Sequence, residues 1–254
     1  TIIRMMMDII KPDSGQIYFM GDKLNQTTKN NIGYLPEERG LYRKLTVSDS
    51  LIYLASLKGL TMKTAKQRSD LLLERIGMIA HKKKKVEELS KGMGQFIQFL
   101  VAIIHDPQLI ILDEPFANLD PVNTELLKEI IIELRNQGKS IVLSTHRMNE
   151  IEELCNRIFM INKGNSVLYG DLSEIKTGYK HNSIILEYKG DLPQLNGIIR
   201  QSTYTDHIEL FFNETTSPQI ILEQLINQKI KIDRFEVSTP SLHDIFLQLV
   251  EKTE

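Results

Sequence analysis

Two carboxylates stand side by side in the stretch LIILDEPFANLDP (109–121), directly after a short apolar run. Such a run is typical of a buried strand in a parallel sheet, and α/β proteins bind ligands at the carboxyl ends of these strands. An Asp at this position could hold Mg²⁺, and the adjacent Glu could polarise a water molecule for attack on a phosphoryl group. Asp113 and Glu114 are therefore a candidate phosphoryl-transfer pair. A helix cap or a surface turn is the alternative interpretation.

Two other segments place polar residues where they could act on the same phosphate. In LSKGM (89–93), Ser90 precedes a predicted helix, and Gly92 allows an anion to approach the free N–H groups of its first turn. The alternative is an ordinary N-cap. His146 follows a second apolar run and is expected at the same sheet edge, where it could contact a γ-phosphate and position the attacking water. A structural histidine is the alternative there.

Two charged segments are less informative. IGYLPEERGLY (32–42) ends a predicted strand in a loop that carries Glu37 and Glu38, and both are most simply interpreted as solvated. The basic run HKKKK (81–85) is interpreted as a solvated loop rather than a phosphate-binding patch.

The elements that must position these residues alternate between strands and helices. LIIL (109–112) and SIVLS (140–144) are continuous apolar runs, which predicts central parallel strands covered on both faces. Between them, Asp120 and Pro121 begin a periodic helix and Gly138 ends it. The segment therefore predicts a βαβ unit.

The flanking segments continue this alternation as far as about residue 170. Apolar residues at helical spacing begin at Thr1, and a short strand between two turns follows. Thr46 has a capping pattern ahead of a helical block, so we expect a helical subdomain at about 46–95. RIFMINKGNSVLYG (157–170) predicts two strands that are joined by a tight turn.

The order of predicted elements restarts at about residue 182. SIILEYKG and HIELFF are predicted strands, Ser217 and Pro218 open a helix, KIDRFEVS is a third strand, and Ser241 caps a final helix. This β-β-α-β-α order predicts a separate α+β domain. We therefore expect two domains, at residues 1–178 and 182–254.

The amino-acid composition excludes few classes of protein. The chain has 254 residues and a net charge of −2, which gives no global reason to expect nucleic acid or an acidic membrane as a partner. Its one cysteine, Cys155, excludes an intrachain disulfide and is expected to be a small core residue. No window reaches the ~18 apolar residues of a transmembrane helix. Any membrane role is therefore expected to act through a partner.

These motifs together resemble those of the ATP-binding subunits of ABC transporters. LSKGM is similar to the signature motif LSGGQ, and LIILDEP is similar to the Walker B strand. The segment 117–120 (ANLD) resembles the D-loop, His146 the switch histidine, and Pro36-Glu37 the Q-loop. The resemblance extends from residue 1 to about residue 170, with the motifs in the expected order.

The sequence departs from the family pattern at a few positions. Lys91 and Met93 replace the second Gly and the Gln of the signature, and Glu37 stands where most members have Gln. These variants, with PEERGLY and STHRM, resemble the branch that includes bacterial sodium-extrusion-type exporters. That branch also carries a small C-terminal domain with an ending similar to PSLHDIFLQLVEK (240–252).

The resemblance implies an α/β fold: a P-loop NTPase (ABC ATPase) core with a parallel sheet and a helical subdomain, followed by a small C-terminal α+β domain. It implies a Mg²⁺-dependent ATPase that powers an exporter. Its implied partners are a second ATP-binding subunit, which completes two nucleotide sites, and permease subunits at the cytoplasmic face of the membrane, with no nucleic acid. The implied site residues are catalytic Glu114 and His146, nucleotide-binding Ser90, Gly92, Glu37 and Asp120, and metal-binding Asp113 and Glu37.

The start of the chain leads to a further expectation. TIIRMMM matches the family helix that directly follows the phosphate-binding loop G-x-x-x-x-G-K-[ST], so we expect that loop before Thr1 and little ATP hydrolysis by the 254 residues alone. A non-catalytic module for dimerisation or permease docking is the alternative. An ABC-type ATPase that acts on ribosomes or DNA is another, but it would be expected to show tandem cassettes or a long coiled coil.

Overall fold

The computed structural model describes residues 1–254 except 39, 180–181, 214, 239–240 and 252–254. The chain divides into two compact units, Thr1–Arg147 and Met148–Glu254. The predicted division at residues 178–182 differs from this one and stays a prediction. Among the described residues, none of the helices has the length and hydrophobicity that a membrane crossing requires.

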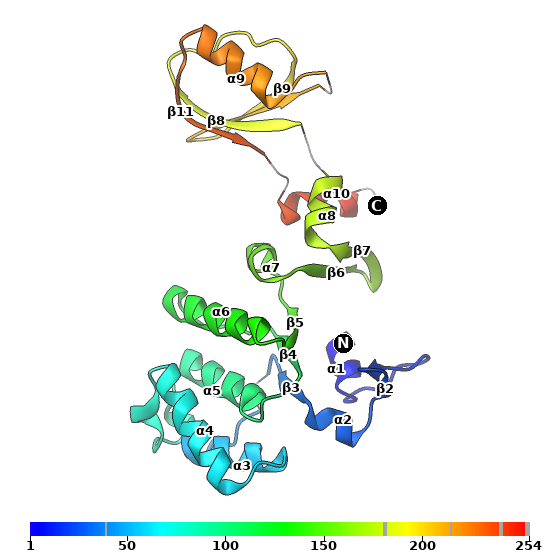
Figure 1. Cartoon of the computed structure of the whole chain (residues 1–254), viewed down its shortest axis with the longest axis vertical. Helices are drawn as coiled ribbons and strands as arrows, with labels where there is room; N and C mark the ends of the chain where they lie inside the picture. The colour runs from blue at the N-terminus through cyan, green and yellow to red at the C-terminus, as the bar shows by residue number, and fades with distance from the viewer. Residues whose placement is uncertain (39, 180–181, 214, 239–240, 252–254) are drawn as a thin grey trace. The chain divides into compact units, whose positions relative to one another are not determined.

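The first unit is built around a three-stranded parallel sheet with the order β3-β4-β5 (Figure 1). In the view of Figure 1, α5 and α6 lie on one side of these strands and α1 and α2 on the other. The elements of this unit, in chain order, are α1 Ile2–Met6, β1 Tyr18–Phe19, β2 Asp22–Lys23, α2 Gln26–Asn30, β3 Ile32–Leu35, α3 Val47–Leu57, α4 Met62–Arg75, the 3-10 helices η1 Ile79–His81 and η2 Val86–Glu88, α5 Lys91–Ile103, β4 Leu109–Asp113, α6 Pro121–Asn136 and β5 Ser140–Ser144.

The two apolar runs form parallel strands, as predicted, but they are not equally covered. Ile110, Ile111 and Leu112 of β4 are fully buried. The sequence predicts the same cover for β5, yet its apolar residues are only half-buried. This prediction was wrong because β5 is the last strand of the sheet in the described part of the chain, whereas β4 has a strand on each side.

The predicted helix starts are present with their caps. Thr46 caps α3 by accepting the N–H of Asp49, and Asp120 caps α6 with Pro121 in the first turn. Helix α5 packs closely against β3, because a Cβ at Gly33 would lie 2.0 Å from the carbonyl oxygen of Ala102. This contact requires glycine and fixes the sheet against α5.

The second unit begins with α7 Met148–Leu154, the hairpin β6 Arg157–Asn162 and β7 Asn165–Asp171, and α8 Leu172–Gly178. The predicted tight turn is present, with Lys163 and Gly164 both at positive φ. Ile158, Leu172 and Leu242 form the core of this part, and half-buried Cys155 packs against it. Leu242 begins the last helix, α10 Leu242–Glu251, so the end of the chain packs beside α7 and α8.

The rest of this unit is a four-stranded antiparallel sheet with the order β11-β8-β10-β9 and the helix α9 Pro218–Asn227 on one face (Figure 1). Its strands are β8 Ser183–Lys189, β9 Ile198–Thr203, β10 Ile208–Phe212 and β11 Lys231–Val237. The predicted strands and helices are present, but the sequence prediction omitted β9. Most of β9 is exposed at the sheet edge, so its residues lack a clear apolar pattern.

Candidate functional site

Asp113 and Glu114 lie at the carboxyl end of the central strand β4, as the sequence predicts. Asp113 pairs in register with Ser144 of β5, and the Ser144 hydroxyl donates a hydrogen bond of 2.6 Å to Asp113 Oδ1. The Ser144 carbonyl in turn accepts the N–H of Glu114 at 2.9 Å. The ends of two neighbouring strands therefore fix the direction of both acidic residues.

Glu114 turns the chain out of the sheet. Its φ is +48°, in the left-handed region that residues with a Cβ adopt rarely. The turn closes through a hydrogen bond of 3.1 Å from the N–H of Ala117 to the Glu114 carbonyl. This backbone conformation directs the carboxylate away from the strand and toward the segment that follows β5.

His146 meets Glu114 at this edge. The Glu114 Oε1 atom lies 2.8 Å from His146 Nδ1 and accepts the His146 backbone N–H at 3.2 Å. When Glu114 is ionised it can only accept a hydrogen bond, so Nδ1 is then the donor in this contact. The Glu114 side chain is 21% exposed and that of His146 is 80% exposed, so most of the imidazole ring faces solvent. The structure brings this pair together; the catalytic roles of the two residues stay predictions.

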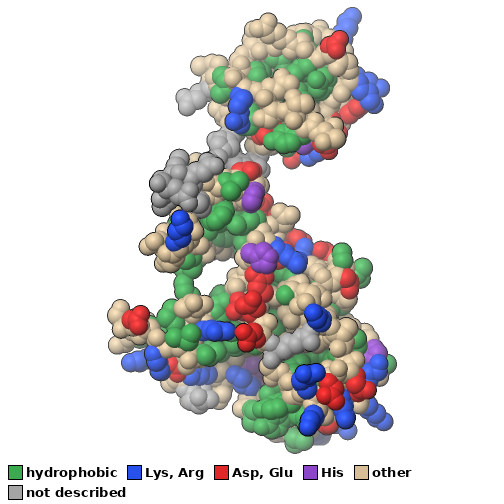
Figure 2. Space-filling view, turned by 180° about the vertical axis from the view of Figure 1, so that it is seen from behind, with side chains coloured by type: hydrophobic (Ala, Val, Ile, Leu, Met, Phe, Trp, Pro, Cys, Tyr) green, Lys and Arg blue, Asp and Glu red, His purple; other side chains and the backbone are tan. Residues whose placement is uncertain are grey.

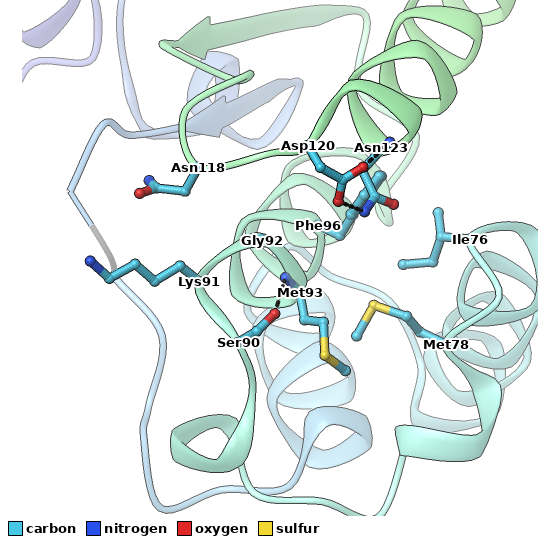
Figure 3. A pocket seen from close by; sticks show the side chains of 10 residues that line it. All are labelled: Ile76, Met78, Ser90, Lys91, Gly92, Met93, Phe96, Asn118, Asp120 and Asn123. Carbon is cyan, nitrogen blue, oxygen red and sulfur yellow. Dashed lines mark hydrogen bonds between the residues drawn. The ribbon is translucent and has the colours of Figure 1, made fainter.

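Ser90, Gly92 and Asp120 meet at a second place in the same unit, a cavity of about 380 Å³ (Figure 3). The first turns of α5 and α6 both border it. A Cβ at Gly92 would lie 3.1 Å from the carbonyl oxygen of Asn118, so the two loops approach closely. The cavity has a polar wall of Ser90, Lys91, Gly92, Asn118, Asp120 and Asn123, and an apolar wall of Ile76, Met78, Met93 and Phe96.

Ser90 and Asp120 also act as helix caps, the alternative that the sequence leaves open. Ser90 Oγ accepts the N–H of Met93 at 3.2 Å, and Asp120 Oδ1 accepts the N–H of Asn123 at 3.0 Å. The hydrogen bonds from Asn123, first from its backbone and then from its amide, lower the pKa of Asp120. The carboxylate is therefore ionised at neutral pH, and the structure gives it a role in stabilising α6.

Glu37 lies in the exposed loop after β3, and among the described residues no hydrogen bond joins it to Asp113 or Glu114. Burial raises the pKa of Tyr34 on β3, and the charges of Asp113 and Glu37 raise it further. Both carboxylates therefore lie within electrostatic range of one tyrosine. Among the described residues there is no cluster of three or more His, Cys, Asp or Glu side chains that could hold a metal ion.

This donor set nevertheless fits Mg²⁺. The ion is usually bound in nucleotide sites through one or two carboxylates, with phosphate oxygens and water as its other ligands. Asp113 supplies a carboxylate whose orientation is held by Ser144. A protein cage of several acidic side chains is therefore not required.

Gln95 is a residue of this site that sequence reasoning missed. It is 4% exposed, and its side-chain amide donates to the carbonyls of Glu114 and Pro115. The only signal was the presence of two glutamines, Gln95 and Gln98, in the otherwise apolar stretch 94–103.

Over the face shown in Figure 2, basic and acidic side chains are intermixed, in keeping with the small net charge.

Comparison with known proteins agrees with this geometry. A model of the family described as ABC transporter matches residues 1–117, and a model described as ATP-binding protein DrrA1-3-like, C-terminal domain, matches residues 170–250. The uncharacterized ABC transporter ATP-binding protein YhaQ of Bacillus subtilis is 44% identical over 98% of this chain and 85% of its own length. The Nod factor export ATP-binding protein I of a Rhizobium species is 30% identical over 98% of this chain and 83% of its own length.

A solved structure of the ATP-binding subunit of an ABC transporter is similar, with a TM-score of 0.64 and 28% identity over 70% of this chain and 75% of that one. These findings confirm the predicted fold class, an ABC ATPase core of the P-loop type with a parallel sheet and a small C-terminal domain. The chain belongs to the family of ABC transporter ATP-binding proteins.

Proposed function

We propose that the protein hydrolyses ATP and thereby powers an ABC transporter. The observation that carries this proposal is the Glu114–His146 contact of 2.8 Å at the carboxyl ends of two adjacent parallel strands. A carboxylate that is held there by two donors of one residue is suited to accept a proton from an attacking water molecule.

In this proposal each residue of the strand edge has one task. Glu114 orients the attacking water and accepts its proton, and His146 contacts the γ-phosphate with the exposed part of its ring. Asp113 holds Mg²⁺, with Glu37 as a second candidate. When bound, the ion neutralises charge on the phosphate oxygens.

We further propose that two copies of the subunit share two nucleotides. Ser90 and Gly92 lie at the first turn of α5, where backbone N–H groups can bind the γ-phosphate of a nucleotide on the partner copy. Asp120, the last residue of the segment 117–120, borders the same cavity and is proposed as a further nucleotide-binding residue. The support is the close approach of Gly92 to Asn118, which joins the signature segment to this loop.

The transporter in this proposal is an exporter whose permease subunits bind the protein at the cytoplasmic face of the membrane. The support is the similarity to a relative that is named for export, the Nod factor protein. We also propose that the protein belongs to the sodium-extrusion-type branch and that its domains span residues 1–178 and 182–254. It is proposed to bind no nucleic acid. A non-catalytic module is the alternative.

The test is the ATPase rate of the full-length gene product and of three variants. Glu114→Gln keeps an oxygen that can accept from His146 but removes the base, so kcat should fall at least about hundredfold. His146→Ala should also lower kcat. Glu129→Gln, an exposed residue of α6, is the matched control and should have the wild-type rate.

A second readout separates the enzyme from a non-catalytic module. Glu114→Gln should form a stable dimer in ATP and Mg²⁺, measured by light scattering, because bound ATP is not turned over. Equal rates for wild type and Glu114→Gln, with no ATP-dependent dimer, would overturn the proposal.

A further inference from the structure

Helix α5 carries two buried glutamines in an otherwise apolar sequence, GQFIQFLVAI. Gln95 and Gln98 are each 4% exposed, and both reach main-chain carbonyls outside their own helix. Gln95 Nε2 donates to the Pro115 carbonyl at 3.1 Å and to the Glu114 carbonyl at 3.3 Å. Gln98 Nε2 donates to the Glu38 carbonyl at 3.3 Å. Burial of an amide is costly without hydrogen bonds, and the side-chain nitrogens of both glutamines are paired. Gln98 Oε1, by contrast, is buried with no hydrogen-bond partner among the described residues.

The Gln95 contacts fall on the peptide groups that set the direction of Glu114. Glu114 has a φ of +48°, and a backbone in this region persists only where its surroundings hold it. On one side, the Glu114 N–H is held by the Ser144 carbonyl; on the other, the Glu114 carbonyl accepts the N–H of Ala117 at 3.1 Å as well as the Gln95 amide. Gln95 therefore completes the set of contacts that hold this turn.

The same helix begins at the other predicted phosphate-binding segment. Ser90 caps α5 and Gly92 lies in its first turn, while Gln95 follows in the next turn. A helix transmits displacement along its axis because its backbone is hydrogen-bonded throughout. A shift of α5 at Ser90 would therefore reach the Glu114 peptide through Gln95.

We propose that Gln95 is a positioning residue for Glu114. Its hydrogen bonds link helix α5, which begins at the LSKGM segment, to the turn that orients the Glu114 carboxylate. This inference rests on the proposed ATPase function for its role in turnover. Its structural part, the support of the 114–117 turn, can be measured without nucleotide.

The first experiment measures amide hydrogen exchange of Ala117 in the full-length gene product without nucleotide. Gln95→Met keeps the length and burial of the side chain but removes both donors, so Ala117 should exchange about fivefold to tenfold faster as the turn opens more often. Gln98→Met is the matched control, because it makes the same change in the same helix but acts on Glu38. It should leave Ala117 exchange at the wild-type rate.

The second experiment measures turnover as a function of pH. Gln95→Met should lower kcat about tenfold or more and leave the KM for ATP unchanged, because Gln95 positions Glu114 and does not contact nucleotide. In Gln95→Glu, the introduced carboxyl group can donate a hydrogen bond only when it is protonated. The kcat of this variant, relative to wild type, should therefore rise as the pH falls, whereas the ratio for Gln95→Met should stay constant.

The outcomes separate this inference from the proposed function. Wild-type Ala117 exchange in Gln95→Met, or equal acceleration in Gln98→Met, would overturn the inference. The same holds if wild type turns over ATP, Glu114→Gln does not, and Gln95→Met has the wild-type kcat. An inactive wild type with faster Ala117 exchange in Gln95→Met would overturn the proposed function and leave the support of the turn established.

Discussion

The buried environment of His105, two residues after the end of α5, predicts a pH-dependent loss of stability that can be traced to one side chain. Its Nε2 lies 3.2 Å from the Ile32 carbonyl, which also accepts the Lys58 ammonium at 3.1 Å. The other ring nitrogen, Nδ1, is buried and has no partner among the residues that the structure describes. Burial, followed by the positive charge of Lys58, lowers the pKa of His105 to about 4. The hydrogen bond to the Ile32 carbonyl opposes this change, Arg68 adds to it, and Asp106 opposes it.

The size of the effect follows from proton linkage. The unfolded chain binds the proton at a pKa of 6.5 and the folded chain at about 4, so acid favours the unfolded state throughout this window. The contribution of neutral His105 to the free energy of unfolding is complete above pH 6.5 and is lost as the pH falls toward 4. Between pH 7.5 and pH 5 the two pKa values give a loss of at most about 2 kcal/mol. Because part of the ring is open to solvent, which screens the charge, we expect about 1 kcal/mol.

The assay is urea unfolding at pH 7.5 and pH 5, followed by circular dichroism because the chain has no tryptophan. His105→Gln keeps an N–H donor for the Ile32 carbonyl but does not titrate, so it should lose about 1 kcal/mol less than wild type over this interval. His243→Gln, an exposed residue of α10, is the matched control and should behave like wild type. Equal losses for wild type and His105→Gln would refute the reasoning.

Two other changes test how the site is supported. Gly33→Ala should destabilise the first unit by about 2–3 kcal/mol, because the new methyl group would overlap the Ala102 carbonyl and lie 2.9 Å from Pro107 Cγ, and urea unfolding would measure it. Thr46→Ala should lower the free energy of unfolding by about 1 kcal/mol through loss of the α3 cap; Thr46→Ser, which keeps the hydroxyl, should restore most of it, and no difference between the two would contradict this role.

Much of the core fold could be predicted because its signals are local. Continuous apolar runs marked β4 and β5, and the caps at Thr46, Ser90 and Asp120 marked three helix starts. Strand β9 was missed because it is held by pairing with β10, and its own residues are mostly exposed. Edge strands of this kind depend on a partner that no sequence window contains.

The candidate site, like the fold, could be predicted from the sequence only in part. The meeting of Glu114 and His146 could be predicted, because both follow adjacent parallel strands and so must reach one edge. The support by Gln95 could not, because its partners are main-chain carbonyls, which every residue possesses. The left-handed conformation of Glu114 was equally hidden, since side-chain type carries little information about it.

That backbone conformation has a consequence for evolution and engineering at position 114. A residue with a Cβ at a φ of +48° costs of order 1 kcal/mol, which glycine would recover. Glu114→Gly is therefore expected to offset part of its entropic cost by relaxing the turn, while it removes the proposed base. A screen that scores folding alone should therefore separate glycine from glutamate only weakly at this position, whereas a screen for turnover should reject glycine.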